Sequence, residues 1–348
     1  MSHDIKRNLI DELLAEQKTL TAVDLFSKRH EEGSLPKQAK YYRDLIPLEK
    51  PKSGEQFAFA VDLDACTGCK ACVSACHSLN GLGYEETWRD VGLLIGGSST
   101  QPVQQTVTTA CHHCLNPACL SGCPVDAYEK DATTGIVRHL DDQCIGCQYC
   151  TLTCPYEVPK YSKKHGIVRK CDMCTNRLAV GEAPACVQAC PNSAIRIEIV
   201  NQDQVARTST ADARLVAGAV DSDYTQPSTR YRTKKIFPEN MAPADRHHLE
   251  PEESHWPVVL MLALKQASVG AFALSFFYGT PLKLVLTLAT ALLGIVIGTF
   301  HLGRPMYAWR AVVGLGHSWL SREIVIFGLY AGLAMAFVGA DWLPQLKP

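Results

Sequence analysis

Residues 144–156 read CIGCQYCTLTCPY, a run in which four cysteines follow the spacing C-x2-C-x2-C-x3-C-P. A short loop of this kind can wrap its first three thiolates round one iron–sulfur cubane. The C-x3-C step begins a helix that points the last thiol elsewhere, and the proline turns the chain away because it fixes φ and lacks an N–H. The spacing therefore predicts that Cys144, Cys147 and Cys150 share one cluster, while Cys154 binds another.

All sixteen cysteines of the chain lie between Cys66 and Cys190, in four groups of four that each end in C-x3-C. A proline follows the last cysteine in three of the groups. The groups are Cys66, Cys69, Cys72 and Cys76; Cys111, Cys114, Cys119 and Cys123; Cys144, Cys147, Cys150 and Cys154; and Cys171, Cys174, Cys186 and Cys190. Four such groups predict four [4Fe–4S] clusters, with ligands that cross between groups.

Two other uses of cysteine fit this pattern less well. A disulfide framework is typical of short secreted chains, whereas the N-terminus, MSHDIKRNLIDELLAEQ, has no apolar signal segment. Structural zinc is usually bound by two separate C-x2-C pairs and does not need three consecutive ligands in one loop. A zinc-stabilised scaffold remains the alternative from another class, and it predicts zinc without redox activity.

The chain has 348 residues and a formal net charge of −1, which suits about two domains and gives no indication of a nucleic-acid partner. Composition divides it into four parts. We expect an N-terminal helical extension over 1–50, a four-cluster domain over 51–200, an extended linker over 201–255 and a membrane anchor over 256–348.

The cluster domain is expected to be an α+β unit of two ferredoxin-like modules. Residues 56–64 and 194–200 predict strands at its two ends, and residues 127–142 predict a hairpin that turns near Gly135. In the extension, apolar spacing and a Thr-x-x-Asp capping pattern predict two helices within residues 5–33. The core is small for the domain, so cluster binding should supply much of its folding free energy.

Three apolar stretches follow the polar segment 201–255. Residues 257–278, 284–302 and 324–343 are each long enough to cross a bilayer, and aromatic residues lie near their ends. We therefore expect a transmembrane segment of about three helices.

The four cysteine groups resemble the iron–sulfur subunit of the dimethyl sulfoxide reductase family of molybdopterin oxidoreductases, over roughly residues 56–200. The x11 gap between Cys174 and Cys186 belongs to the resemblance. In nitrate reductase relatives a tryptophan replaces one cysteine of the third group, whereas here that group is all cysteine. The resemblance therefore favours the dimethyl sulfoxide or polysulfide reductase branch.

The resemblance also implies how the groups pair, which spacing alone does not. Group one pairs with group four, and group two pairs with group three. The implied ligand sets are Cys66, Cys69, Cys72 and Cys190 (quartet 1); Cys76, Cys171, Cys174 and Cys186 (quartet 2); Cys111, Cys114, Cys119 and Cys154 (quartet 3); and Cys123, Cys144, Cys147 and Cys150 (quartet 4).

The segment HLGRPMYAWRAVVGLGHSWLSREI, which starts at His301, resembles the beginning of the membrane anchor subunit of the same family. We therefore expect two subunits to be joined in one chain. The resembled anchor has eight spans and only three are expected here, so the anchor is either truncated or completed by a separate chain. The resemblance implicates His301 in a quinol site. An interfacial histidine could take a proton from quinol because its pKa is near neutral, but contact with headgroups or water would explain it equally well.

Orientation follows from the charged loops. The loop after the second span carries Arg304, Arg310 and Arg322, whereas the opposite loop carries only Lys283. The positive-inside rule therefore favours the cytoplasmic side of the inner membrane for the arginine loop and for the cluster domain. Export of the complex, as occurs in the resembled family, is the competing expectation.

We expect an electron-transfer subunit that is not an enzyme by itself. Quinol would donate electrons, four [4Fe–4S] clusters would carry them, and a molybdopterin subunit would reduce an acceptor such as dimethyl sulfoxide. A further anchor chain, membrane lipid and the quinone pool are the other expected partners. Reverse flow, as in formate dehydrogenase, is the alternative. Near the ligands, His112 and His113 are expected only to flank a cluster, and basic residues 160–170 to form a solvated surface or a docking face.

Overall fold

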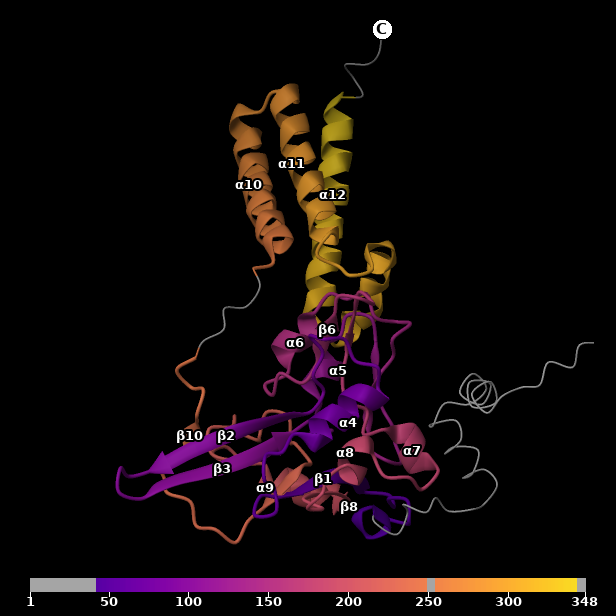
Figure 1. Cartoon of the computed structure of the whole chain (residues 1–348). Helices are drawn as coiled ribbons and strands as arrows, with labels where there is room; N and C mark the ends of the chain where they lie inside the picture. Colours follow the sequence, from indigo (N-terminus) through magenta and orange to yellow (C-terminus); the bar gives the residue numbers. More distant parts are fainter. Residues whose placement is uncertain (1–41, 249–253, 343–348) are drawn as a thin grey trace, which may run out of the picture.

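The computed structural model describes residues 42–248 and 254–342 of the chain. The two helices expected within residues 5–33 lie outside this part. Figure 1 shows a loop-rich cluster domain below three long helices. The α+β fold with a helical membrane segment is as predicted.

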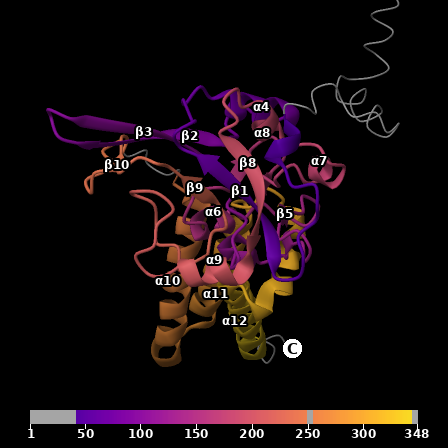
Figure 2. The same ribbon diagram turned by 90° about the horizontal axis from the view of Figure 1, so that it is seen from below.

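The two ends of the cluster domain meet in one sheet. Strand β1 (Glu55–Asp62) pairs antiparallel with β8 (Ile195–Asn201) and parallel with β9 (Arg230–Arg232), so β1 is the central strand (Figure 2). Its residues are buried on both faces from Gln56 to Val61, which explains why it reads as a nearly continuous apolar run. The strands expected at 56–64 and 194–200 are confirmed.

Three hairpins complete the strands of the domain. The longest, β2 (Asp90–Gly97) with β3 (Pro102–Thr109), extends away from the rest of the domain and is joined by β10 (Ala242–Pro243). The hairpin expected within 127–142 is present as β4 (Tyr128–Lys130) and β5 (Val137–His139), and Gly135 has a φ of +69° in its turn. The third consists of β6 (Lys160–Ser162) and β7 (Ile167–Arg169).

A short helix follows each cysteine loop. Two are α4 (Ala71–Leu79) and α6 (Tyr149–Thr153), and both start after a residue with positive φ, Lys70 at 60° and Gln148 at 58°. These left-handed residues allow the loop to reverse sharply before the helix begins. The others are α5 (Ala118–Gly122), α7 (Thr175–Ala179) and α8 (Ala185–Gln188).

The cysteines belong to two apolar cores, one for each module. In the first core, Phe57, Phe59 and Ile197 of the β1–β8 sheet pack with several buried cysteines. In the second, Tyr128 and Val137 of the β4–β5 hairpin and Ile167 of β7 do the same. Nine of the sixteen cysteines are buried, whereas Cys69 is exposed. At the buried positions a charged thiolate needs a compensating charge.

The domain boundaries differ from those expected from composition. Helix α9 (Gln202–Thr208) and strands β9 and β10 make the described part of 201–255 a component of the cluster domain, not a linker. At the other end, the 3-10 helix η1 (Arg43–Leu45) contributes Leu45 to the first core. Polar composition concealed the later segment because strand pairing uses backbone groups that every residue carries.

The C-terminal part consists of three apolar helices, α10 (Trp256–Tyr278), α11 (Pro281–Thr299) and α12 (Trp319–Trp342). Within the described residues these are the helices long and apolar enough to cross a membrane. Helix α12 begins five residues earlier than expected, and Arg322 in its first turn donates to the carbonyl oxygens of Leu315 and Gly316. A 3-10 segment, η2 (Pro305–Gly316), joins α11 to α12 and lies against the cluster domain.

Candidate metal centres

Three cavities in the cluster domain are each lined by four cysteines. The space within them, including the solvent at their openings, is about 310, 370 and 270 Å³. The cysteines that line them are, in turn, Cys66, Cys69, Cys72 and Cys190; Cys111, Cys114, Cys119 and Cys154; and Cys123, Cys144, Cys147 and Cys150. Each cavity thus takes its fourth cysteine from a distant cysteine group, in the sets that the resemblance implies.

The remaining four cysteines also gather, between α4 and the loops on either side of α7. Cys76 on α4 and Cys186 on α8 are buried, as is Cys171, and the thiols are close enough to raise one another's pKa. Among the described residues, no three His, Cys, Asp or Glu side chains converge tightly enough for a single metal ion. Quartet 2 thus takes Cys76 from the first cysteine group and its other three members from the fourth, as the resemblance implies.

Burial disfavours free thiolates at these positions. It raises the pKa of the Cys114, Cys147 and Cys174 thiols to about 12 and that of Cys76 to about 11. Because a metal ligand must be the thiolate, a positively charged metal core has to supply the stabilisation that water cannot. Unlike these, Cys144 has a lowered pKa, because His139 and backbone amides outweigh the effect of burial.

Three buried polar groups lie beside the cysteines. Arg89 Nη2 has no hydrogen-bond partner within the described residues, the Tyr128 hydroxyl faces the Cys150 thiol, and the His139 ring faces the Cys144 thiol. Tyr128 and His139 line the cavity of quartet 4. A buried polar atom without a partner is costly, and an iron–sulfur cluster would offer thiolate and sulfide acceptors to such donors. The donor set therefore fits clusters held by the four quartets.

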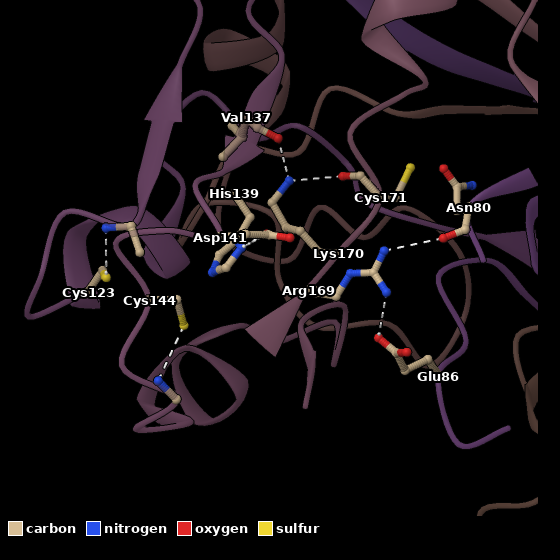
Figure 3. A network of polar contacts seen from close by, with 12 residues as sticks. Asn80, Glu86, Cys123, Val137, His139, Asp141, Cys144, Arg169, Lys170 and Cys171 are labelled. Carbon is tan, nitrogen blue, oxygen red and sulfur yellow. Dashed lines mark hydrogen bonds and ion pairs between the residues drawn. The ribbon is translucent and has the colours of Figure 1, made fainter. Parts of the chain in front are cut away.

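Residues beside the cysteines are more buried, and make more hydrogen bonds and ion pairs, than their sequence positions indicated. His112 is buried, its Nδ1 lies 2.9 Å from Thr229 Oγ1, and its ring packs edge-on against Tyr156. Burial lowers the pKa of His112 to about 3, so its ring is neutral. The expectation of a solvated basic run is wrong for two members: Arg169 pairs with Glu86, and Lys170 is buried (Figure 3).

The anchor contacts the loop that carries Cys144 and Cys147. His301 Nε2 lies 3.2 Å from the Cys147 carbonyl oxygen, and the Arg304 amide donates to the Ile145 carbonyl oxygen at 3.0 Å. Since a carbonyl only accepts, Nε2 of His301 carries the hydrogen, which leaves Nδ1 as an acceptor in the neutral ring. Burial and nearby His255 lower the pKa of His301 more than the Cys147 carbonyl raises it.

The other end of the same anchor loop contacts the segment that carries Cys123, the remaining cysteine of quartet 4. His317 Nε2 lies 3.0 Å from the Cys123 carbonyl oxygen and 3.2 Å from Asp126 Oδ1. The hydroxyls of Ser318 and Ser321 donate to the carbonyl oxygens of Gly122 and Pro124. The anchor loop therefore touches the backbone on both sides of the quartet 4 cavity.

Three glycines make the closest approach between anchor and cluster domain. A Cβ atom on Gly303 would lie 2.1 Å from the Gly166 carbonyl oxygen, and one on Gly146 would lie 3.0 Å from the Gly303 Cα. Gly146 and Gly166 also have positive φ, which favours glycine there. We call this contact of Gly146, Gly166 and Gly303 the glycine joint.

Comparison with known proteins agrees with this architecture. Residues 103–199 match the family model described as a 4Fe-4S dicluster domain, and residues 252–344 match that of the DMSO reductase anchor subunit (DmsC). The B subunit of the anaerobic dimethyl sulfoxide reductase of Haemophilus influenzae is 34% identical over 190 residues, covering 52% of this chain and 91% of that relative. This chain therefore belongs to the family of dimethyl sulfoxide reductase iron–sulfur subunits. The resemblance drawn from the cysteine groups and from the anchor segment is confirmed.

Other relatives of this iron–sulfur subunit are named for the same oxidoreductase and for a different one. The B subunit of the anaerobic dimethyl sulfoxide reductase of Escherichia coli K12 is 33% identical over 181 residues, covering 50% of this chain and 86% of the relative. The formate dehydrogenase-O iron-sulfur subunit of the same strain is 32% identical over 158 residues, covering 40% and 52%. The present chain is thus an electron-transfer subunit, not catalytic on its own, with an integral membrane anchor attached.

Sequence reasoning missed several residues that the structure places at the site. His255 precedes α10, and its ring lies 4.6 Å from that of His301 in an edge-on arrangement. His317 stood in the quoted anchor segment but was given no role. Arg89 lies outside every cysteine group, so no local spacing could have marked it. For His255, the sequence offered one signal of a functional role, which is that this histidine directly precedes an apolar span.

Proposed function

We propose that this chain relays electrons from quinol to a molybdopterin catalytic subunit through four [4Fe–4S] clusters, which supply one-electron chemistry when bound. The metal ligands are the sixteen cysteines in quartets 1 to 4. The observation that carries the proposal is the docking of the anchor loop on quartet 4, where His301 and His317 contact the carbonyl groups of Cys147 and Cys123. This contact makes quartet 4 the end of the relay nearest the membrane.

The order of the quartets follows from the helices that join them. Cys119 and Cys123 lie one helical turn apart at α5, and Cys150 and Cys154 do so at α6. Residues at this spacing have Cβ atoms about 5–6 Å apart, so quartets 3 and 4 are neighbours. Cys72 and Cys76 on α4 join quartets 1 and 2 in the same way.

The junction between the two modules is bridged by Lys170. Its Nζ lies 3.6 Å from the Cys111 Sγ of quartet 3 and 2.9 Å from the carbonyl oxygen of Cys171, a quartet 2 residue. The proposed order from the membrane is therefore quartet 4, 3, 2 and 1. Quartet 1 would then face the catalytic subunit, and its exposed Cys69 is consistent with that.

His301 is proposed as a quinol-binding residue. It follows α11 at the end of a span, it is held by Cys147, and its Nδ1 remains available to accept a hydrogen bond from a quinol hydroxyl. His255 lies against the same ring from the start of α10 and would form the second wall. Quinol bound here would lie beside the loop that carries quartet 4.

The inner membrane is the proposed location, with the cluster domain on the cytoplasmic side by the positive-inside rule. Arg304 and Arg310 also donate to the carbonyl oxygens of Asp141 and Asp142, so these arginines help to dock the anchor loop. A further anchor chain is a proposed partner, because the resembled anchor has more spans than the three helices described here.

Metal and acid-labile sulfide analysis of the anaerobically purified chain tests the cluster assignment. We expect about sixteen iron and sixteen sulfide per chain, four of each for four clusters. About four zinc without sulfide would contradict the proposal and support the scaffold alternative.

His301→Ala tests the quinol site. We expect full iron content but slower reduction of the clusters by a quinol analogue, by about twofold to 12-fold, because one hydrogen bond contributes about 0.5–1.5 kcal/mol. The control is His247→Ala, which removes an exposed histidine from the segment before α10. Equal quinol rates in both variants would exclude His301 from the site, and reduction by dithionite should be unchanged in both.

The direction of flow is tested with the same protein. Reduction of the clusters by a low-potential quinol, followed by little back transfer to the quinone, supports quinol oxidation. Rapid net transfer from dithionite-reduced clusters to quinone, with no reduction by quinol, would instead support the formate dehydrogenase-like direction.

A further inference from the structure

Two buried cations lie beside the quartets without an acidic partner. Lys170 is only 3% exposed; its Nζ donates to the carbonyl oxygens of Val137 and Cys171 and lies 3.6 Å from the Cys111 Sγ (Figure 3). The ammonium group therefore lies at the junction of quartets 2 and 3.

The second cation is Arg89, which is 2% exposed. Its Nη1 donates to Thr108 Oγ1 at 3.2 Å, and that hydroxyl lies 3.6 Å from the Cys72 Sγ of quartet 1. The guanidinium lies over the Phe59 ring, and its Nη2 has no hydrogen-bond partner within the described residues. Because Cys76 of quartet 2 is one helical turn beyond Cys72 on α4, Arg89 lies at the junction of quartets 1 and 2.

A buried charge without a counter-ion is strongly unfavourable, so such a pair of residues needs an explanation. Among residues 42–248 and 254–342, no ion pair joins either cation to a carboxylate. A cluster bound by four thiolates is an anion, since the thiolates outweigh the positive charge of the core. It gains a further negative charge when it accepts one electron, and the local charges of a site set its potential.

We propose that Lys170 and Arg89 are built-in counter-ions that favour the reduced clusters at the two junctions and so raise the reduction potentials of quartets 1, 2 and 3. This inference rests on the proposed four-cluster relay. Quartet 2 lies beside both cations and quartet 4 beside neither. The step itself is a one-electron reduction of the cluster, in which no bond or proton changes place at either side chain.

Both side chains are suited to carry a positive charge here. Three acceptors surround Lys170 Nζ, namely the carbonyl oxygens of Val137 and Cys171 and the Cys111 Sγ, which matches the three N–H donors of an ammonium group. The guanidinium of Arg89 stays protonated in proteins.

A purely structural role makes a different prediction. If Lys170 served only to tie Val137 and Cys171 together, glutamine could donate the same kind of hydrogen bond without the charge. Lys170→Gln and Arg89→Gln therefore remove charge, and Lys170→Arg retains it. Lys164→Gln is the matched control, because Lys164 is exposed on the same β6–β7 hairpin.

The test is redox titration of the purified full-length chain, followed by electron paramagnetic resonance. We expect Lys170→Gln to lower the midpoint potentials of the clusters assigned to quartets 2 and 3. Arg89→Gln should lower those of quartets 1 and 2, so the two variants share the effect on quartet 2. One cluster, assigned to quartet 4, should keep its midpoint in both variants. Lys170→Arg and Lys164→Gln should keep all midpoints near those of the unmodified chain. Unchanged midpoints in both glutamine variants with full iron content would overturn the inference.

Loading of the clusters is measured in every variant. If a glutamine variant binds less iron, recovery of iron and midpoints in Lys170→Arg supports the role of charge, and failure of Lys170→Arg to recover them overturns it for Lys170. Failure of the proposed function is a separate result, since it would be seen in the unmodified chain as zinc or as missing sulfide.

Discussion

Gly303→Ala is expected to separate the anchor loop from the cluster domain. The new methyl group would lie 2.1 Å from the Gly166 carbonyl oxygen and 2.7 Å from the Tyr161 hydroxyl, so the backbones must move apart. Overpacking of this kind costs about 1–3 kcal/mol, which lowers the ratio of docked to undocked chains by about fivefold to 150-fold. Cluster reduction by a quinol analogue should fall correspondingly, while the iron and sulfide content stays at the unmodified level.

The matched control is Gly316→Ala, because a Cβ atom on Gly316, in the same loop, would have no atom within 4 Å. Amide hydrogen exchange provides a second measurement. The Arg304 amide, bonded to the Ile145 carbonyl oxygen, should exchange faster in Gly303→Ala but not in Gly316→Ala. Equal quinol rates and equal protection in the two variants would show that the glycine joint does not hold the anchor.

Cys190→Ala is expected to remove or convert the cluster of Cys66, Cys69 and Cys72, although Cys190 stands beside Cys186 in the sequence. Cys190 lines the same cavity as those three residues. The electron paramagnetic resonance spectrum of Cys190→Ala should therefore lack the same signal as that of Cys69→Ala. The signal lost in Cys174→Ala should remain present.

Double variants sharpen this test, because ligands of one cluster act as a unit and their losses do not add. Cys69→Ala with Cys190→Ala should affect one cluster, and Cys174→Ala with Cys190→Ala should affect two. Asn192→Ala is the control, since Asn192 lines the cavity of quartet 1 without supplying a thiol. Loss of the Cys174 signal in Cys190→Ala would refute the crossed pairing.

The sequence was informative wherever function depends on short spacing. The C-x3-C step that ends each group favours one helical turn, so the helices at Cys72, Cys119 and Cys150 could be predicted from local geometry. Strand β1 was visible because a strand buried on both faces reads as an apolar run. The spans were visible because the bilayer sets their length.

Contacts between distant segments had no such local signal. Thr229, in a segment that composition marked as a linker, bonds His112 across 117 residues. Lys170 belongs to a basic run that suggested a solvated surface, yet its side chain is buried beside Cys111 and Cys171. The anionic metal centres that we propose would compensate for its loss of hydration. The burial of a side chain beside a cofactor depends on the charge of that cofactor. Sequence rules that place charged residues at the surface do not include this charge, so they predict the wrong position.

The docking of the anchor loop on the cluster domain has a consequence for assembly, because both partners are in one chain. When such partners are separate subunits, the occupied fraction depends on their concentrations, and dilution releases them. A tether replaces this dependence with an effective concentration of about millimolar for a short linker. The contact between the anchor loop and the quartet 4 segment would then form and break as a unimolecular equilibrium that does not depend on expression level. A weak interface would therefore suffice where separate subunits need a strong one.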